Sequence, residues 1–273
     1  YHDSPTTMRE IARLREVTFR AAGGGTGKEL DLDKFDYAED PYKQLISWDP
    51  EEEEILGGYR YKVCDKETKP ENLATHKMFH FSEKFMQEFL PYTIELGRSF
   101  IQPKFQSTGS ARKTLYALDN LWDGLGALVV KNPNNEYFFG KVTMYPHFNQ
   151  KARDLILHFL HKEFFDAYDL VHPKKPEKIT TDEKELDQIF TGDNYDQNLK
   201  ILSQEVRKLG ENIPPLINAY MNLSRTMKIF GTALNKSFGN VEETGIMITI
   251  SDIYPKKKKR HVETFREEQG KYQ

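Results

Sequence analysis

The sequence predicts a single α/β or α+β domain built on a mixed β-sheet. Two observations predict this fold class. Segments with apolar residues at helical spacing are interleaved with segments of alternating or continuous apolar residues along the chain. In addition, 273 residues are enough for one good core, and a hydrophobic content of 38% favours a folded protein over a disordered one.

The first part of the chain is expected to hold a helix, a strand pair and a long strand. Ser4 suits the N-cap of the helix and Pro5 its first position. The helix carries an apolar stripe and ends in the glycine-rich stretch 21–27. The elements that follow are expected, in order, as strands at 45–48 and 58–63 around an acidic turn, mixed helix and loop at 79–89, and a long strand at 92–105.

The second part begins with the segment 114–130, which is apolar nearly all round and therefore predicts a buried central helix. The later elements are expected as a strand at 137–145, helices at 152–165, 183–190, 199–209 and from 213, and closing strands at 229–233 and 245–253. We expect one domain over residues 1–254, with a largely helical excursion at about 174–212, followed by an exposed basic and polar tail over 255–273.

Composition narrows the class of function. The single cysteine, Cys64, excludes an internal disulfide and a Cys-based zinc site and fits a reducing cytoplasm. A net charge of −3 argues against a dedicated nucleic-acid binder. The longest apolar runs are far shorter than a transmembrane helix. The chain does not begin with Met, so an earlier segment is left open.

A spaced set of charges is the strongest candidate for chemistry. Several of these charges end or adjoin apolar runs, where an uncompensated charge is costly, so they must pair or meet a ligand. The set consists of Arg15, Asp31, Asp33, Asp36, Arg60, Glu95 and Arg98. On physical grounds alone, an ion-pair network that locks neighbouring strands explains the set about as well as a binding site does.

Three other motifs have simpler explanations. The stretch Gly23–Lys28 has Ala22 where a Walker A motif needs Gly, lacks the final Ser or Thr, and follows a helix. His158 and His161 lie one helical turn apart, but no third metal ligand accompanies them, so we expect surface histidines and no metal site. The basic run Lys256–Arg260 would suit an anionic membrane surface or nuclear import, with a solvated run as the default.

Taken together, the charges resemble the pattern of the acyltransferase family that contains the acyl-homoserine-lactone synthases and the ornithine- and glycine-lipid N-acyltransferases, a branch of the GNAT fold. The pattern consists of Arg-x-x-x-Phe, an acidic element, Gly-x-x-Arg and Glu-Leu-x-Arg. It is carried here by Arg15 and Phe19, by Asp31, Asp33 and Asp36, by Gly57 and Arg60, and by Glu95 and Arg98. The Pro-Pro-Leu-x-x-x-Tyr element of the lipid-forming branch matches residues 214–220, and the resemblance covers residues 8–252.

This resemblance implies a GNAT-like fold: a central mixed, mostly antiparallel sheet flanked by helices, with a helical C-terminal elaboration. It also implies an N-acyltransferase that moves a long-chain acyl group, with or without a 3-hydroxyl, to the amine of a small amino acid. Glycine is the first choice of acceptor, and amino-acid lipid biosynthesis is the implied process. The co-substrate would be an acyl carrier protein thioester or acyl-CoA, and no permanently bound cofactor is implied.

The same resemblance, with the chemistry of amide formation, implies roles for individual residues. Glu95 would be the general base, acting through a water, with Arg98 as the second catalytic residue. The residues expected to bind the acceptor are Arg15, Phe19, Asp33, Asp36 and Arg60. The residues expected to bind the acyl donor are Phe100, Ile101, Gln102, Arg112 and Lys113, with backbone N–H groups near 100–102 stabilising the oxyanion.

Two further expectations concern the donor. An acidic acyl carrier protein would dock on the basic pairs Arg112–Lys113 and Lys151–Arg153. No clear pyrophosphate-binding loop follows the long strand, the nearest stretch being 106–112, so the choice between carrier protein and CoA stays open. An acyl channel would draw on the aromatic residues of 79–89 and 137–139, although such residues more often form core.

The sequence also bears on the location of the protein and on alternative functions. A cytoplasmic enzyme is expected, with peripheral contact at the inner face of the membrane as an option and no nucleic-acid partner. A membrane-active, hemolysin-like protein would need an insertable segment, and none is seen in the sequence. An autoinducer-type acyl-homoserine-lactone synthase is the nearer alternative, but its branch keeps a Trp where this chain has the glycine-rich stretch.

Overall fold

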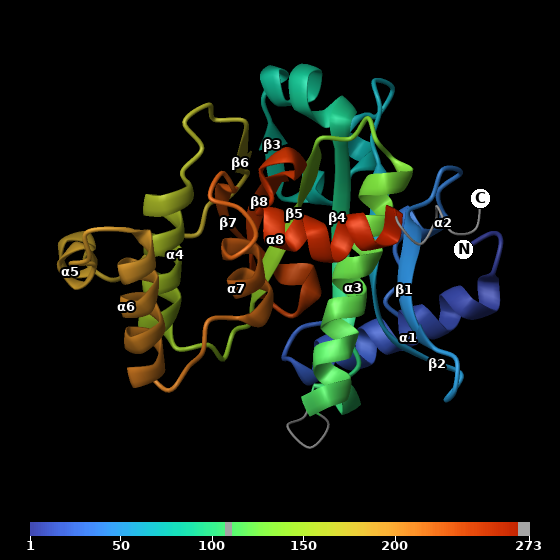
Figure 1. Cartoon of the computed structure of the whole chain (residues 1–273), viewed down its shortest axis with the longest axis horizontal. Coiled ribbons are helices and arrows are strands. Elements are labelled where there is room, and N and C mark those ends of the chain that lie inside the picture. The colour runs from blue at the N-terminus through green and yellow to red at the C-terminus, as the bar shows by residue number, and fades with distance from the viewer. Residues whose placement is uncertain (107–110, 267–273) are drawn as a thin grey trace.

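The computed structural model describes residues 1–106 and 111–266, leaving out the side chains of 111–118. Its centre is a sheet with the strand order β1-β2-β4-β5-β8-β7, in which β4 and β5 run parallel and the other neighbours antiparallel (Figure 1). The strands are β1 Lys43–Asp49, β2 Glu54–Val63, β4 Thr93–Ile101, β5 Tyr137–Met144, β8 Val241–Thr249 and β7 Lys228–Asn235. The predicted mixed, mostly antiparallel sheet is therefore confirmed.

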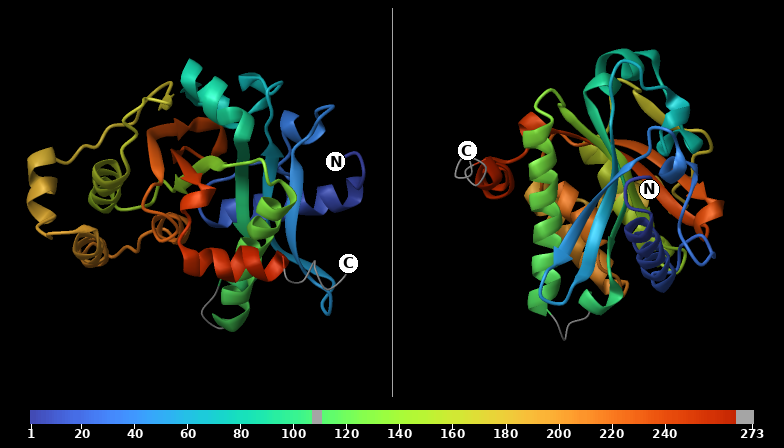
Figure 2. Two further views of the ribbon diagram at one scale, coloured as in Figure 1. Left: turned by 45° about the horizontal axis from the view of Figure 1, so that its top comes forward. Right: turned by 90° about the vertical axis from the view of Figure 1, so that its right-hand side faces the viewer.

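Helices cover both faces of this sheet (Figure 2, right). On one face lies α1 (Pro5–Ala21), whose stripe of Met8, Ile11, Leu14 and Phe19 packs with Phe100 and Val241. On the other face lie α3 (Ala111–Lys131) and α4 (Gln150–Phe164), which share a core with apolar residues of β4, β5 and β8. Ser4 precedes α1 as predicted, but its side chain makes no capping hydrogen bond.

Short elements complete the fold. Lys34–Tyr37 forms the one-turn helix α2. β3 (Phe79–Phe81) and β6 (Val171–Pro173) make a two-stranded sheet that the sequence pattern did not predict, because three residues are too few to show alternation. It covers a second apolar cluster, which includes Phe79, Phe85 and Phe139.

The helical excursion was predicted in its main features. It contains α5 (Glu183–Ile189) and α6 (Tyr195–Lys208), which lie at the edge of the molecule farthest from β1 (Figure 1). The next helix, α7 (Pro215–Met221), begins with a proline at its first position, where the missing N–H costs no hydrogen bond.

Residues 255–263 are mostly exposed, as expected of a tail, but they are helical and packed against the domain. Pro255–Lys258 forms α8, a π-helical turn continues it through Lys259–Glu263, and this segment crosses α3 (Figure 1). His261 is buried and lies 2.6 Å from Oδ1 of Asp123. The contact depends on a glycine in α3, because a Cβ at Gly126 would lie 1.9 Å from the carbonyl oxygen of His261. The division into one domain and a tail stays a prediction.

The parallel pair of strands separates part-way along its length. β4 and β5 are paired at Thr93–Tyr137, Ile94–Phe138 and Glu95–Phe139. β4 also carries one extra residue relative to β2, since Arg60 faces Gly97 while Gly58 faces Phe100. This bulge contains Arg98, whose φ of 51° lies in the left-handed region.

Candidate active site

A cavity of about 580 Å³ opens where β4 and β5 separate. Successive strand residues point to opposite faces of a sheet, and the cavity is lined from both faces, by α1 residues on one side and α3 residues on the other. On the α1 side its polar residues include Arg60, Glu95, Arg98, Lys141, Tyr145 and Glu243. On the α3 and α7 side it is mainly apolar, with Leu121, Trp122, Leu216, Ala219 and Ile246.

Glu95 occupies the end of the paired segment, immediately before the strands separate. It is completely buried, and four donors among the described residues meet its carboxylate. Thr75 donates its N–H at 2.9 Å and its hydroxyl at 2.5 Å to Oε1. Ala74 donates its N–H at 3.2 Å to Oε2, and the hydroxyl of Tyr42 also donates to Oε2. The turn that begins at Thr75 supplies these amides because N–H groups at the start of a helical turn have no partner within it.

Burial raises the pKa of Glu95 to about 7, although the amide of Thr75, the charge of Lys141 and the amide of Ala74 oppose the shift. The desolvation of the carboxylate therefore outweighs a set of hydrogen bonds that favours its charged form. A carboxyl group that titrates near neutral pH can both accept and release a proton at physiological pH, so this residue suits general base catalysis.

Three arginines and three aspartates form a network beside the cavity. Arg15 lies 3.1 Å from Asp31 and 3.2 Å from Asp36. Arg60 lies 2.8 Å from Asp33 and 3.2 Å from Asp36. Arg98 lies 2.7 Å from Asp31 and 3.7 Å from Asp33. Each arginine thus has two carboxylate partners, and each aspartate has two arginines.

Three members of the network lie away from the cavity. The side chains of Arg15, Asp31 and Asp36 are fully buried, and none of the three is part of the cavity wall. Burial alone would raise the pKa of Asp36, but Arg15 and Arg60 outweigh it and hold that pKa below its ordinary value. Asp36 also accepts from the N–H of Asp33 at 3.0 Å, which closes the one-turn helix α2.

Two other predicted acceptor residues, Phe19 and Arg60, line the cavity, as does Arg98, which is predicted to be catalytic. The predicted acceptor residue Asp33 is not part of the cavity wall. Asp33 is the N-cap of α2, with its carboxylate accepting from the N–H of Phe35 at 3.0 Å. The roles of all these residues stay predictions.

Of the residues predicted to bind the acyl donor, some line the cavity and others do not. Phe100 and Ile101 line the cavity. The N–H of Gln102 donates to the carbonyl of Leu56 at 3.0 Å, and its side-chain amide donates to the carbonyl of Ile55, so this residue is bound to β2. The side chains of Arg112 and Lys113 lie outside the described part of the chain, as do residues 107–110 of the stretch nearest to a pyrophosphate loop.

Two surface expectations are wrong. Arg153 is buried and bonded to Glu242 at 2.7 Å and Asp154 at 2.6 Å, so it does not form a docking pair with Lys151. His158 is also buried, with Nε2 3.1 Å from Oδ1 of Asp187.

The glycine-rich stretch 21–27 has a structural role, and the aromatic residues of 79–89 and 137–139 are only partly in the cavity wall. Glu16 accepts from the N–H groups of Thr26 and Gly27, each at 2.9 Å, so a carboxylate occupies the amides that a phosphate loop would offer. Among the aromatic residues expected near an acyl channel, Phe138 and Phe139 line the cavity. Phe79 and Phe85 do not line the cavity, and they pack with Phe139 in the second apolar cluster.

Residues that stand in no sequence motif complete the site. Tyr42 and Thr75 hold Glu95, and an ion pair of Lys141 with Glu243 lies in the cavity wall. Lys141 follows Phe139 in the alternation of β5, which was a usable signal, because a lysine on a strand face shared with a buried aromatic needs a partner.

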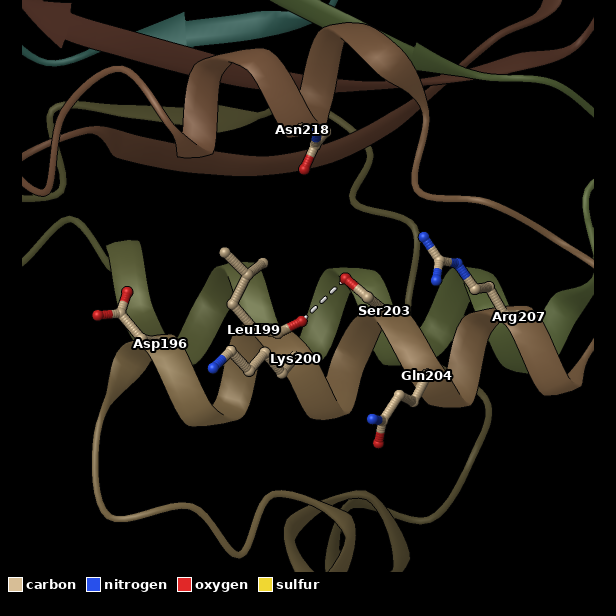
Figure 3. Close-up of a pocket in the computed structure, with 7 residues that line it drawn as sticks. All are labelled: Asp196, Leu199, Lys200, Ser203, Gln204, Arg207 and Asn218. Carbon is tan, nitrogen blue, oxygen red and sulfur yellow. Dashed lines mark hydrogen bonds between the residues drawn. The ribbon is translucent and has the colours of Figure 1, made fainter.

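A second groove lies away from the sheet, between α6 and α7 (Figure 3). Its wall consists of polar and charged side chains from one face of α6, with Leu199 and with Asn218 from α7. No strand of the main sheet contributes to it, and we assign it no chemistry.

A sheet whose parallel strands separate around a cavity, with a buried carboxylate that titrates near neutral pH, defines an acyltransferase of the GNAT class. The family model described as Acetyltransferase (GNAT) domain matches residues 14–116. The Glycine N(alpha)-acyltransferase of Phocaeicola vulgatus is 58% identical over 269 residues, which cover 97% of this chain and 82% of that protein. The Glycine N(alpha)-acyltransferase of Bacteroides thetaiotaomicron is 56% identical over 269 residues, which cover 97% of this chain and 80% of that protein.

No solved structure matches the chain. The extent and identity of the two curated relatives nevertheless show the family: this chain belongs to the GNAT acyltransferases and is an enzyme of that type. The resemblance stated from the sequence is thereby confirmed. Within the described residues, no helix combines the length and the apolar character needed to cross a bilayer.

Proposed function

We propose that this enzyme transfers a long-chain acyl group from a thioester to the amine of glycine. The observation that carries the proposal is the buried Glu95, with a pKa of about 7, at the point where β4 and β5 separate. The names of two relatives that are more than half identical support glycine as the acceptor.

The reaction needs a base because glycine is an ammonium ion at neutral pH. The amine must lose one proton before its nitrogen can attack the thioester carbonyl. The C–N bond then forms, which leaves a positive charge on the nitrogen and a negative charge on the carbonyl oxygen. The nitrogen loses a second proton as collapse breaks the C–S bond, and the thiolate that leaves takes up one proton. The net products are an amide, a thiol and one proton released to solvent. This sequence needs no covalent acyl-enzyme.

The contacts of Glu95 favour a particular path for the first proton. An ionised carboxylate offers about four lone-pair sites, and four donors already meet this one. A substrate amine or a water can therefore reach it only by replacing a donor. The hydroxyl of Tyr42 both lines the cavity and donates to Glu95, so it can pass its own proton to the carboxylate while accepting one from the amine.

The oxyanion needs donors close to the same reacting centre. Residues advance by about 3.3 Å along a strand, so the amides at 100–102 lie roughly 17–23 Å along β4 from Glu95. The bulge at Gly97 and Arg98 lies only about 7–10 Å away on the same scale. We therefore assign the oxyanion to backbone N–H groups of the bulge and assign Phe100 and Ile101 to contacts with the arm of the donor. A Cβ added to Gly97 would meet nothing within 4 Å, which is consistent with open space at this position.

The two sides of the cavity suit the two substrates. The apolar side is lined by Pro214, Pro215, Leu216 and Tyr220, the residues of the Pro-Pro-Leu-x-x-x-Tyr element, and by Leu121 and Trp122 of α3. An acyl chain gains free energy when such surface removes it from water. The polar α1 side would hold the amino acid.

The acyl donor stays open between two thioesters, and the chemistry of the product indicates the process and the place in the cell. Either an acyl carrier protein or CoA can present a thioester on a phosphopantetheine arm. An N-acyl amino acid with a long chain is an amphiphile, so we place the reaction in amino-acid lipid biosynthesis, in the cytoplasm beside the inner membrane face.

The experiment is a direct assay with purified enzyme. Long-chain acyl-CoA and the matching acyl carrier protein thioester are supplied separately with isotope-labelled glycine, and products are read by mass spectrometry. We expect labelled N-acylglycine and one free thiol for each amide formed. Absence of any N-acyl product with either donor would overturn the proposal.

A further inference from the structure

An ion pair that the mechanism above does not use lies in the cavity wall. Nζ of Lys141 is paired with Oε2 of Glu243, and both side chains line the cavity. The side chain of Lys141 is 14% exposed and that of Glu243 is 4% exposed. Removing two charges from water costs free energy that a single ion pair does not always recover, so a buried pair at a cavity calls for an explanation.

Register places this lysine beside the base. Glu95 faces Phe139 across the parallel strands, and Lys141 lies two residues further along β5 on the same face of the sheet. The step along the strand is about 7 Å. The positive charge of Lys141 also acts on Glu95 directly, since it lowers the pKa of that carboxyl against the effect of burial.

The number of carboxylate partners separates Lys141 from the arginines. Arg15, Arg60 and Arg98 each have two aspartate partners, whereas Lys141 has one carboxylate partner among the described residues. An ammonium group has three N–H donors, so one carboxylate partner leaves donors for a ligand in the cavity that Lys141 lines. The second oxygen of Glu243 accepts from the side-chain amide of Asn235 at 3.3 Å, which fixes this carboxylate from behind.

The acceptor supplies the missing partner. Glycine enters as a zwitterion, and its carboxylate must find a cation when the cavity removes it from water. We propose that Lys141 binds the carboxylate of the acceptor amino acid, held in position by Glu243, and thereby makes the enzyme select amino acids over simple amines. This inference rests on the proposed function. It assigns that carboxylate to Lys141 and not to Arg60, an expected acceptor-binding residue whose partners are aspartates.

The arrangement also orients the reacting nitrogen. With its carboxylate on Lys141, a short amino acid has its amine one carbon away, in the space toward Tyr42 and Glu95. The amine thus approaches the proposed proton acceptor and the β4 bulge together, and no side chain of the acceptor has to be accommodated for this purpose.

The test compares glycine with glycinamide, which keeps the amine and loses the negative charge. Assays are run from pH 7 to 9.5 and the plateau values of the kinetic parameters are compared, so that the effect of Lys141 on the pKa of Glu95 does not enter. For the wild type we expect kcat/KM to favour glycine by at least about 50-fold. For Lys141→Met we expect KM for glycine to rise about 10- to 100-fold, kcat to change by less than about fivefold, and the preference to fall to nearly one.

Two further variants make the result specific. Lys141→Arg keeps the charge and should restore the preference to within about fivefold of the wild type. Lys228→Met is a matched control, since Lys228 is also mostly buried and paired with a buried carboxylate, that of Asp166 at 3.5 Å, but does not line the cavity. It should leave the preference unchanged.

The inference and the proposed function fail in different ways. If the wild type acylates glycine and Lys141→Met keeps both its KM and its preference, the inference is overturned and the function stands. If the wild type acylates no amine, the function falls, and calorimetric titration of glycine into both proteins decides the inference. Weaker binding to Lys141→Met supports it, and equal binding or none to either protein overturns it. If Lys141→Met does not fold, Lys141→Gln takes its place with the same expectations.

Discussion

The hydroxyl of Tyr42 donates a hydrogen bond to the carboxylate of Glu95, across 53 residues of sequence. Tyr42 precedes β1 and Glu95 lies in β4, so the contact bridges β2, which separates these two strands in the sheet. The same hydroxyl accepts the N–H of Ala74 at 2.9 Å. Tyr42 is therefore fixed on one side by the backbone and lines the cavity beside the base.

The first prediction concerns this hydroxyl. Tyr42→Phe removes a donor that favours the charged carboxylate, so we expect the acidic limb of the kcat profile to move up by about one pH unit. Because the proton path is also lost, kcat on the plateau should fall at least tenfold. Steady-state assays from pH 5.5 to 9 measure both effects.

The control for that variant is Tyr61→Phe, which alters a half-buried tyrosine of the neighbouring strand outside the cavity wall. It should leave kcat and its pH dependence within about twofold of the wild type. A plateau in Tyr42→Phe equal to that of the wild type would rule out the relay.

The second prediction concerns pH and stability. Burial gives Glu95 a pKa of about 7, against an ordinary value of 4.5. The folded state therefore holds this proton more tightly than the unfolded chain does. The stabilisation is complete below about pH 4.5, declines as pH rises toward 7, and is lost above 7, by about 3 kcal/mol in all.

Urea unfolding at several pH values measures this effect by comparing the wild type with Glu95→Gln, which has no proton to lose. The difference in unfolding free energy between the two proteins should change in favour of the variant between pH 5 and pH 8. A pH-independent difference would mean that the pKa of Glu95 in the folded protein is not near 7.

The third prediction concerns the network of arginines and aspartates. Asp36→Asn leaves Arg15 and Arg60 each short of one buried carboxylate, so we expect a loss of about 3–5 kcal/mol in unfolding free energy. Arg9→Ala is the control. It breaks an ion pair whose side chains are 67% and 79% exposed, and it should change stability by less than about 0.5 kcal/mol.

The same variant separates a structural role from acceptor binding. If the network is structural, the folded fraction of Asp36→Asn should keep the KM of the wild type for glycine. A raised KM with unchanged stability would restore Asp36 to the acceptor site.

The fourth prediction concerns Gly140, at the point where β4 and β5 separate. A Cβ there would lie 2.6 Å from the carbonyl oxygen of Leu96, so Gly140→Ala must push the strands apart. We expect a loss of about 1–3 kcal/mol in stability and a larger fall in kcat than in donor affinity. The control is Gly210→Ala, at an exposed loop glycine where an added methyl group would meet no atom within 4 Å. It tests backbone strain alone, because the φ of Gly210 is 81°.

Much of the fold could be predicted because its signals are long. The all-apolar pattern of 114–130 and the alternation of 137–145 located α3 and β5 to within a few residues. The short strands β3 and β6 and the helix after residue 254 gave no comparable signal. Five lysines and arginines in succession indicate a solvated tail, and the contact that orders them depends on Gly126 and His261, which lie far away from each other in the sequence.

The site was predicted unevenly for a related reason. Glu95 and Arg98 became candidates because they stand in a recognisable local motif. Tyr42, Lys141 and Glu243 stand in no such motif, and only the pairing of β5 with β4 and β8 brings the last two beside Glu95. Sequence alone also could not tell an ion-pair network from a binding site. The structure pairs every arginine of the set with two aspartates, which favours the network.

The central claim is that Glu95 is the base for N-acyl transfer to glycine. The most direct measurement is the rate of N-acylglycine formation by Glu95→Gln at saturating glycine and acyl thioester, at pH 8, with the fold verified by circular dichroism. We predict a fall in kcat of at least 100-fold, with binding of the acyl donor retained. A folded Glu95→Gln enzyme that forms N-acylglycine at the rate of the wild type would contradict the account.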